Sequence, residues 1–255
     1  MYAEERQQAI ADLVTQRGRL SVVELADRFT VTTETVRRDL SVLERAGVVR
    51  RVHGGAIPAR ALAVLELAVN ERDISHAEEK DRIASAALAL LPDNGGTILL
   101  DAGTTTARLA DLLPQEHSYT VFTNAVPIAA RLAVRPNVEL HLLPGRVRST
   151  TQAAVGEEAV AALAPLRTDV VFLGTNGLSV AHGLSTPDQS EAATKRAMLA
   201  SARQVVALAD SSKIGVESTV RFADLDQVDV IVTDSGISDA DRDALKALDI
   251  DLVIA

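Results

Sequence analysis

Residues 32–56 read TTETVRRDLSVLERAGVVRRVHGGA and decide the fold of the N-terminal part of the chain. Apolar residues recur there at helical spacing, at Val36, Leu40 and Leu43. These side chains must pack inward, which turns Arg38 outward and leaves Arg37 on the flank. Thr32 or Thr33 is a suitable N-cap, and Gly47 a suitable stop. The stretch therefore predicts a helix that ends at residue 46 and carries arginines on its exposed side.

Two more helices are predicted upstream. Apolar residues at positions 10, 13 and 14 indicate the first helix, which Gly18 ends. Ser21 then offers an N-cap for the second helix, with Glu24 in capping-box position three residues later. A tight connection at Thr30 and Val31 leads into the helix of residues 32–46. Three short helices with a tight turn before the third are typical of a helix-turn-helix.

The residues after the third helix, VVRRVHGG at 48–55, predict a short β-wing whose glycines allow a tight return. Guanidinium and hydroxyl groups suit base edges and phosphates, so this region is a candidate DNA-binding surface. The alternative is an ordinary solvated helix face. The candidate DNA-binding residues are Ser21, Thr32, Thr33, Thr35, Arg37, Arg38, Arg50, Arg51, His53 and Gly54.

Charge is distributed unevenly along the chain. Residues 1–60 contain ten Arg and eight acidic residues, a balance of +2, whereas residues 61–255 contain sixteen Lys and Arg and twenty-seven acidic residues, a balance of −11. The sum is the net charge of −9. An acidic body is repelled by nucleic acid, so contact with DNA is expected only at the N-terminal end.

Composition excludes several classes of protein. There is no cysteine, hence no disulfide framework, thiolate metal site or cysteine nucleophile. No apolar run is long enough to span a membrane, and residues 1–10 lack the apolar core of a signal peptide. We expect a soluble cytoplasmic protein with no membrane partner. The histidines are scattered without metal-ligand spacing, so neither a metal nor a cofactor is expected.

The run TTETVRRDL at 32–40 resembles the signature of the DeoR family of bacterial transcription regulators, and ERAGVVRRVHGGA at 44–56 resembles that family's wing. The resemblance implies that Thr35, Arg37 and Arg38 lie on a recognition helix that reads double-stranded operator DNA. Asp39 is expected to be a structural partner of a nearby arginine, because a carboxylate facing phosphates is unfavourable.

The remainder of the chain alternates apolar strand-like runs with helical segments, which predicts an α/β domain with a mostly parallel sheet. The predicted strands are 97–100, 120–123, 138–143, 169–174, 204–209, 229–233 and 251–254. An amphipathic helix is predicted at 78–91. We expect a winged helix-turn-helix domain at 1–57, a linker at 58–75, part of it helical, and the α/β domain at 76–255.

Polar residues follow several of these strands, where ligands bind in parallel sheets. DAGTTT at 101–106 begins a helix whose backbone N–H groups suit a phosphate, and Lys213 or an arginine at 146 or 148 would add positive charge. Taken alone, such a turn is often only a cap, and Lys213 only a surface lysine. The candidate effector-binding residues are Asp101, Gly103, Thr104, Thr105, Asn124, Arg146, Asn176, Gly177, Glu191 and Lys213.

GTNGLSVAHGLSTPDQSEAATKRAM at 174–198 and ADSSKIG at 209–215 resemble the effector domain of DeoR regulators, with Ser185 where the family usually has Thr. That domain is similar in fold to ribose-5-phosphate isomerase and glucosamine-6-phosphate deaminase. The resemblance implies a repressor of a sugar-utilisation operon released by a phosphorylated sugar. Because residues 1–60 resemble fructose-operon repressors, fructose 1-phosphate is the first expectation and glycerol 3-phosphate comes behind it.

Two other functions stay open at this point. An isomerase-like enzyme with a DNA-binding appendage would need a general base, yet the turn at 174–176 carries Asn176, whose amide is no base at neutral pH. Glu191 and Lys195 have the spacing of a helical i,i+4 ion pair. A protein-interaction module is the third possibility. A homo-oligomer, dimer or tetramer, is expected for a regulator that occupies paired half-sites.

Overall fold

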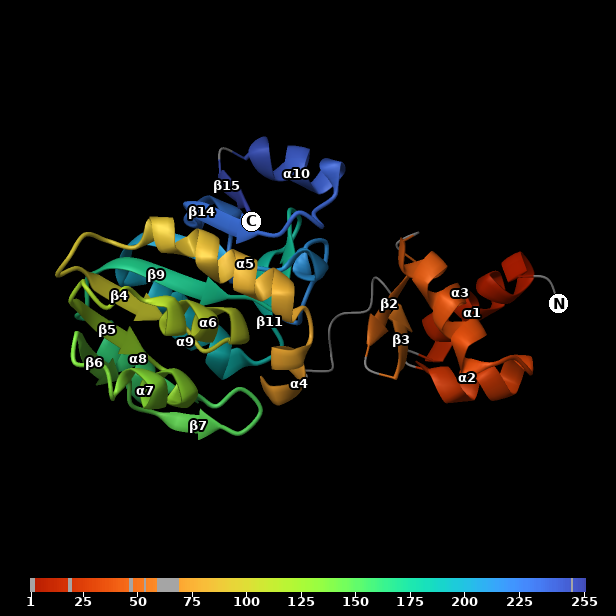
Figure 1. The fold of residues 1–255 in the computed structure, drawn as a ribbon, viewed down its shortest axis with the longest axis horizontal. Coiled ribbons are helices and arrows are strands. Elements are labelled where there is room, and N and C mark those ends of the chain that lie inside the picture. The colour runs from red at the N-terminus through yellow and green to blue at the C-terminus, as the bar shows by residue number, and fades with distance from the viewer. Residues whose placement is uncertain (1–2, 18–19, 46–47, 53, 59–68, 249) are drawn as a thin grey trace. The chain divides into compact units, whose positions relative to one another are not determined.

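The chain divides into two compact units, Met1–Leu62 and Ala63–Ala255, named here the N-terminal unit and the C-terminal unit. This computed structural model describes residues 3–17, 20–45, 48–52, 54–58, 69–248 and 250–255 (Figure 1). The expected domain boundaries remain predictions, since most of the expected linker, residues 59–68, lies outside the described residues. Its last part, Val69–Ile74, forms helix α4 within the C-terminal unit.

The N-terminal unit is a winged helix-turn-helix. Its elements are α1 (Ala3–Arg17), β1 (Leu20–Ser21), α2 (Val22–Phe29), α3 (Thr33–Arg45), β2 (Val49–Val52) and β3 (Gly55–Pro58). The strands form an antiparallel sheet in the order β1-β3-β2. Ile10, Leu25, Val36 and Leu40 are at most 1% exposed and join the helices in one core. The predicted helix-turn-helix and wing are confirmed.

Local caps place the two helices of the helix-turn-helix. The Ser21 hydroxyl accepts a hydrogen bond from the Glu24 amide at 3.1 Å, and the Glu24 carboxylate accepts one from the Ser21 amide at 2.8 Å, which is the predicted capping box. Thr30 ends α2 in the left-handed conformation, with φ 54°. The Thr32 hydroxyl then accepts from the Thr35 amide at 3.2 Å. Gly47, the predicted stop of α3, lies outside the described residues.

Gly55→Ala is expected to lower the free energy of unfolding of the N-terminal unit by about 2–3 kcal/mol, because a methyl group cannot fit between β1 and β3. A Cβ at position 55 would lie 2.2 Å from the carbonyl oxygen of Leu20. Gly54→Ala is the control, since Gly54 (φ +76°) faces open space and the new methyl meets only left-handed strain, about 1 kcal/mol. Urea unfolding followed by circular dichroism measures both. Equal losses would contradict the expectation.

The C-terminal unit is built on one seven-stranded parallel sheet. Its strands, in spatial order, are β15 (Asp251–Ile254), β14 (Val230–Thr233), β12 (Ala202–Leu208), β9 (Thr168–Gly174), β4 (Thr97–Leu100), β5 (Tyr119–Thr123) and β6 (Val138–Leu142). Every pairing in it is parallel. All seven predicted strands are confirmed to within two residues at each end.

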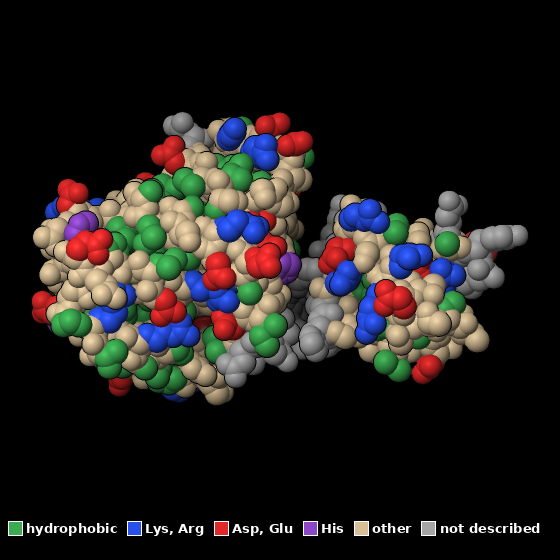
Figure 2. Space-filling view, in the orientation of Figure 1, with side chains coloured by type: hydrophobic (Ala, Val, Ile, Leu, Met, Phe, Trp, Pro, Cys, Tyr) green, Lys and Arg blue, Asp and Glu red, His purple; other side chains and the backbone are tan. Residues whose placement is uncertain are grey.

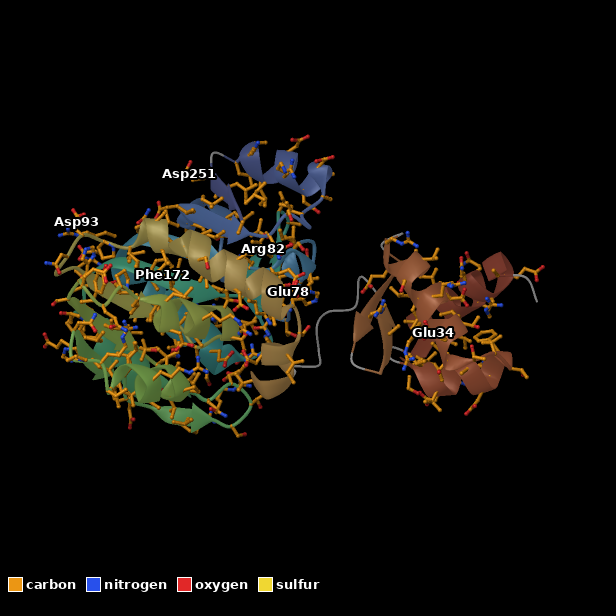
Figure 3. The ribbon with its side chains drawn as sticks, in the orientation of Figure 1. Glu34, Glu78, Arg82, Asp93, Phe172 and Asp251 are labelled. Carbon is orange, nitrogen blue, oxygen red and sulfur yellow. The ribbon has the colours of Figure 1, made fainter. Side chains whose placement is uncertain are left out.

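Helices cover both faces of this sheet, which therefore has a core on each side. The covering helices are α5 (Ala77–Ala87), α6 (Thr104–Leu112) and α7 (Val126–Leu132) on one face, and α8 (Glu157–Leu163), α9 (Gln189–Ala200) and α10 (Asp239–Lys246) on the other. Figure 1 looks onto the α5–α6–α7 face. Phe172 on β9, fully buried, packs on that side, whereas its neighbours Val171 and Leu173 pack on the opposite side (Figure 3).

Smaller elements surround the sheet. A hairpin is formed by β7 (Arg146–Arg148) and β8 (Ala153–Val155), and an antiparallel sheet by β10 (Gly177–Ser179), β11 (Gly183–Thr186) and β13 (Val220–Ala223). Short 3₁₀ turns span Leu88–Leu90, Ser211–Lys213 and Leu225–Gln227. The helix predicted at 78–91 is thus α5 followed by the first of these turns. The small antiparallel sheet was not predicted, because β10 and β11 are rich in Gly and Ser and β13 is interrupted by Arg221.

Candidate DNA-binding surface and effector cleft

Helix α3 presents arginines to solvent and apolar residues to the core, as predicted. Val36, Leu40 and Leu43 are buried, whereas Arg37 and Arg38 are exposed. In the space-filling view of Figure 2, arginine side chains lie exposed on the N-terminal unit with acidic side chains among them. The exposed side of α3 therefore offers guanidinium groups on a helix of the width that enters a major groove.

Asp39 is the buried exception among the charged residues of α3. Its carboxylate is 4% exposed and accepts hydrogen bonds from Arg6 Nε at 2.6 Å and from Gln7 Nε2 at 2.9 Å. The predicted structural role of Asp39 as an arginine partner is confirmed. This pair fixes α1 to α3 and so sets the orientation of the recognition helix.

The other arginines of this surface differ in how firmly they are held. Arg51 on β2 donates to the Ser41 hydroxyl at 2.7 Å and pairs with Glu44, which attaches the wing to α3. Arg37 makes an exposed ion pair with Glu34 at 3.3 Å. Arg38 makes no hydrogen bond or ion pair with any described residue. Of the three arginines, Arg38 can therefore contact a ligand without breaking a hydrogen bond or an ion pair with a described residue.

The remaining candidate DNA-binding residues fall into three groups. The Ser21 hydroxyl is used in the α2 cap, and those of Thr32 and Thr35 lie 2.9 Å apart in the α3 cap, so their side chains already have structural roles. Thr33 and Gly54 are exposed at the start of α3 and in the wing turn. His53 and the side chain of Arg50 lie outside the described residues. DNA contact by all of them remains a prediction.

In the C-terminal unit, a cleft that is partly open to solvent lies at the carboxyl ends of the central strands. It is bounded by the residues that follow β4, β9 and β12, as expected for a parallel sheet. The candidates Gly103, Thr104, Thr105, Asn176, Glu191 and Lys213 all line it. Candidates from four separate stretches of sequence are therefore brought together at one site.

The start of α6 forms one wall of the cleft. Gly103 precedes the helix in an extended conformation, and the Thr106 hydroxyl donates to the carbonyl oxygens of Asp101 at 2.7 Å and Gly103 at 2.9 Å. These bonds hold the turn in place. The first amides of a helix have no intrahelical partner and carry partial positive charge, so this wall suits an anion.

A buried ion pair forms the floor beneath the cleft. The Nζ atom of Lys195 pairs with the carboxylate of Asp101, and both side chains are at most 6% exposed. Lys195 also donates to the Gly174 carbonyl oxygen at 2.9 Å and lies 5.2 Å from the centroid of the Phe222 ring. Burial raises the pKa of Asp101, and the charge of Lys195 opposes that rise. Lys195 has i,i+4 spacing to Glu191, but its ion pair among the described residues is with Asp101.

Glu191 is held by a different set of groups. Arg148 Nη1 pairs with Glu191 Oε1 at 2.7 Å, and the hydroxyls of Thr151 and Thr186 donate to the same carboxylate at 2.5 and 3.1 Å. Burial acts to raise the pKa of Glu191, but Lys195 and these partners outweigh burial and lower it. Glu191 is therefore a neutralised, fixed wall of the cleft rather than a free acid or base.

Three further charged residues line the cleft, namely Lys80, Asp210 and Lys213. Lys80 is 5% exposed, and its Nζ donates to the carbonyl oxygens of Arg72 and Ser75. Burial is the main cause that lowers the pKa of Lys80 to about 8. Burial would raise the pKa of Asp210, but the charge of Lys213 and a Ser212 hydrogen bond lower it. Lys213, which alone reads as a surface lysine, is thus part of the site.

Four candidate effector-binding residues do not line the cleft, and each has a structural reason. Asp101 lies beneath it, paired with Lys195. The side-chain amide of Asn124 is hydrogen-bonded to the backbone: its oxygen accepts from Ala102 N at 3.0 Å, and its nitrogen donates to Ala154 O at 3.1 Å. Gly177 packs so closely that a Cβ would lie 2.4 Å from Val216 O. Arg146 is exposed on β7, and Arg148 is the arginine of this hairpin that reaches the site.

Several cleft residues were not among the candidates, namely Arg72, Ser75, Lys80, Thr106, Thr151, Lys195 and Asp210. Lys80 lies among other charged residues at a helix start, Glu78, Glu79 and Asp81. Arg72 fell in the expected linker. Only packing against distant segments turns these side chains toward the cleft.

No helix among the described residues is long and apolar enough to cross a membrane.

The fold and site define a helix-turn-helix regulator with a second, cleft-bearing α/β unit. The DeoR-like helix-turn-helix domain matches residues 6–60, and the DeoR C terminal sensor domain matches residues 75–235. The chain belongs to the DeoR family of transcriptional regulators, as its sequence signature predicted. The expected class, a DNA-binding regulator rather than an enzyme, is confirmed.

Similar proteins cover almost the full chain. The HTH-type transcriptional regulator GlpR of Haloferax volcanii is 35% identical over 99% of this chain and 98% of its own. The uncharacterized HTH-type transcriptional regulator FruR of Bacillus subtilis is 36% identical over 92% of each chain. The glycerol-3-phosphate regulon repressor of Escherichia coli is 32% identical over 91% of this chain and 90% of its own.

Solved structures are more distant. Ribose 5 phosphate isomerase A from Neisseria gonorrhoeae aligns with a TM-score of 0.39 and 14% identity, covering 54% of this chain and 53% of that one. A likeness of this size carries no argument about ligand or activity.

Proposed function

We propose that the protein represses a sugar-utilisation operon and leaves its operator when a phosphorylated sugar, fructose 1-phosphate before glycerol 3-phosphate, occupies the cleft. The relatives named above support a repressor of sugar-phosphate metabolism, one of them by its printed name, a glycerol-3-phosphate regulon repressor. Fructose 1-phosphate rests on the resemblance of residues 1–60 to fructose-operon repressors and on the similarity to a FruR regulator.

The charge balance of the cleft is the observation that carries this proposal. Six charged side chains among the described residues line the cleft: Arg72, Lys80, Lys195, Lys213, Glu191 and Asp210. Lys195 and Glu191 are neutralised by their partners, Asp101 and Arg148. Three cations then remain against Asp210, a surplus of 3 − 1 = 2 positive charges. This surplus matches a phosphate dianion, and the start of α6 adds amide donors.

The isomerase alternative has less support from the same geometry. Isomerisation of a phosphosugar needs a base that is free to take a proton. Asp101 is held by Lys195 and Glu191 by Arg148, and the Asp210 carboxylate accepts hydrogen bonds from the amide and the hydroxyl of Ser212. The turn after β9 offers only the amide of Asn176. The cleft is therefore better suited to holding a ligand than to transforming it.

DNA binding is assigned to the exposed side of α3, with Arg38 and Arg37 as the leading contacts and the wing beside them. A single α3 reads only a few base pairs, so we assign paired half-sites to a dimer or a dimer of dimers. Release then requires that the phosphosugar bind more tightly to the arrangement that does not fit the operator.

The proposal is tested by operator release. An operator is selected from a random-sequence DNA library with the wild-type protein, and its binding is measured by fluorescence anisotropy at several salt concentrations. Fructose 1-phosphate, glycerol 3-phosphate, ribose 5-phosphate and glucosamine 6-phosphate are then added, each beside its unphosphorylated parent. Release by one phosphosugar and not by its parent is expected. Turnover of a phosphosugar, or release by none, would overturn the proposal.

The affinity of the cleft for the phosphosugar is expected to fall as the pH rises above about 8, by up to tenfold per pH unit. Burial lowers the pKa of Lys80 to about 8. The charge of Asp210 acts to raise this pKa, and the charges of Lys213, Arg108 and Arg72 lower it further. A phosphate favours the protonated amine, and its own second pKa, about 6, lies well below this range. Titration calorimetry between pH 7 and 9.5 measures the effect, with the unphosphorylated parent as control.

The same shift has the opposite sign for stability. The folded state binds fewer protons than the unfolded state between the lowered pKa of Lys80, about 8, and its ordinary value of 10.5. Its contribution to the free energy of unfolding therefore rises with pH in that window. Phosphosugar affinity that stayed constant from pH 7 to 9.5 would show that Lys80 does not meet the phosphate.

A further inference from the structure

Arg72 on α4 lines the cleft, and its guanidinium has no partner among the residues that the structure describes. Its Nε and Nη2 atoms are buried and form no hydrogen bond with any described residue. A buried charged donor without a partner is costly in a folded protein, since it has lost its water contacts without replacement. Such an arginine is well suited to an anion, because the guanidinium fork matches two phosphate oxygens at once.

Helix α4 is tied to three sides of the cleft. The Val69 amide donates to the Thr150 carbonyl oxygen at 3.0 Å, in the hairpin loop that also carries Thr151. Arg108 on α6 pairs with the Asp73 carboxylate at 2.5 Å and donates to the Asp73 carbonyl oxygen at 3.0 Å. On the third side, the Arg72 carbonyl oxygen accepts from Lys80 on α5.

This helix is short, and its position in the chain is special. At six residues, α4 is too short to be stable by itself, so its order depends on contacts such as these. In sequence it directly follows residues 59–68, which join the two units. A ligand that engaged α4 would therefore act on the first described element after the joining segment.

We propose that Arg72 is a direct ligand of the effector's phosphate group, so that phosphate binding stabilises α4, the first described element after the joining segment. The proposal rests on the proposed function and adds to it the residue and the helix that detect the ligand. Arg72 supplies one of the three cations counted above, and the start of α6 lines the same cleft.

The test compares phosphorylated and unphosphorylated ligands on variants of the full chain. Arg72→Gln is expected to weaken binding of the phosphosugar that releases the wild type by roughly 100-fold, the usual scale for a buried charged contact. Binding of its unphosphorylated parent should stay within about twofold. Arg72→Lys, which keeps the charge but loses the fork, should fall between the two.

The matched control is Arg82→Gln. Arg82 lies exposed on α5 and carries the same charge on the same unit (Figure 3). Its loss is expected to leave the affinity for the phosphosugar within about twofold of wild type. A general effect of net charge on anion binding would instead weaken both variants alike and overturn the proposal.

Hydrogen–deuterium exchange gives a second readout. The phosphosugar is expected to slow exchange of the α4 amides at least tenfold in the wild type and not in Arg72→Gln, while the amides of the buried strand β9 remain unchanged in both.

Failure of this inference is separable from failure of the proposed function. If the wild type binds none of the phosphosugars, the proposed function is wrong. If the wild type binds a phosphosugar and Arg72→Gln binds it equally well, or if Arg72→Gln weakens the unphosphorylated parent to the same degree, Arg72 is not a phosphate ligand. Unchanged α4 exchange in the wild type would remove the role of α4 alone.

Discussion

Arg38→Ala is expected to lower operator affinity by roughly 100-fold or more, because a bidentate arginine contact to a base is worth about 1–3 kcal/mol and a dimer loses it at both half-sites. Arg38 is exposed on α3 and has no partner among the described residues, so the variant should fold normally. Fluorescence anisotropy with the selected operator measures the loss. The affinity for the phosphosugar, held by the other unit, should not change.

Two comparisons make the Arg38 result specific. Arg82→Ala removes the same charge from the C-terminal unit and should leave operator affinity within about twofold. Binding to a scrambled duplex distinguishes the kind of contact, since a phosphate contact is lost on both DNAs and lowers the salt slope by about one, whereas a base contact is lost mainly on the operator. Operator affinity equal to that of the wild type would remove Arg38 from the DNA-binding surface.

Lys195→Met is expected to lower the free energy of unfolding of the C-terminal unit by about 3–5 kcal/mol, because it leaves the Asp101 carboxylate buried without its cation. The two side chains are 6% and 2% exposed, so water cannot replace the lost partner. Without Lys195, burial raises the pKa of Asp101 with less opposition. The loss should therefore be larger at pH 7.5 than at pH 5, where protonation removes the charge.

A double variant and a surface control complete this experiment. Asp101→Asn combined with Lys195→Met removes both charges and should recover most of the lost stability. Arg203→Met breaks an exposed pair, Arg203 with Asp169 at 3.6 Å, and should change stability by no more than about 0.5 kcal/mol. Urea unfolding followed by circular dichroism compares the variants. A Lys195→Met loss no larger than the Arg203→Met loss would show that the buried pair contributes little.

The sequence predicted the elements of this protein better than its site. Strand and helix signals are local, since a buried parallel strand is an unbroken apolar run and a cap lies within three residues of the amide it serves. The seven strands of the main sheet and the Ser21–Glu24 box were therefore found. In the small antiparallel sheet, β10 and β11 contain Gly and Ser and β13 contains Arg221, so none of the three is an unbroken apolar run, and they were missed.

The site was predicted in part, and the misses have one cause. Thr104, Thr105 and Lys213 were found because they follow strand-like runs, where a parallel sheet places its ligands. Asn124 follows a strand in the same way, yet its side-chain amide forms hydrogen bonds with the backbone and does not line the cleft. Arg72 and Lys80 precede the first strand of the sheet, and nothing in their local sequence indicates that they reach its carboxyl edge.

The sequence by itself determined the helix-turn-helix, the parallel sheet and the family, because helix caps, hydrophobic patterns and family signatures depend on residues that are close together in the sequence. Only the tertiary structure decided which charged side chains pair with one another and which remain to contact a ligand. Lys195 reaches Asp101 across 94 positions of sequence rather than its helical neighbour Glu191, which takes Arg148 instead. Such pairings depend on the distances between side chains in space, and the spacing of residues along the sequence does not predict these distances.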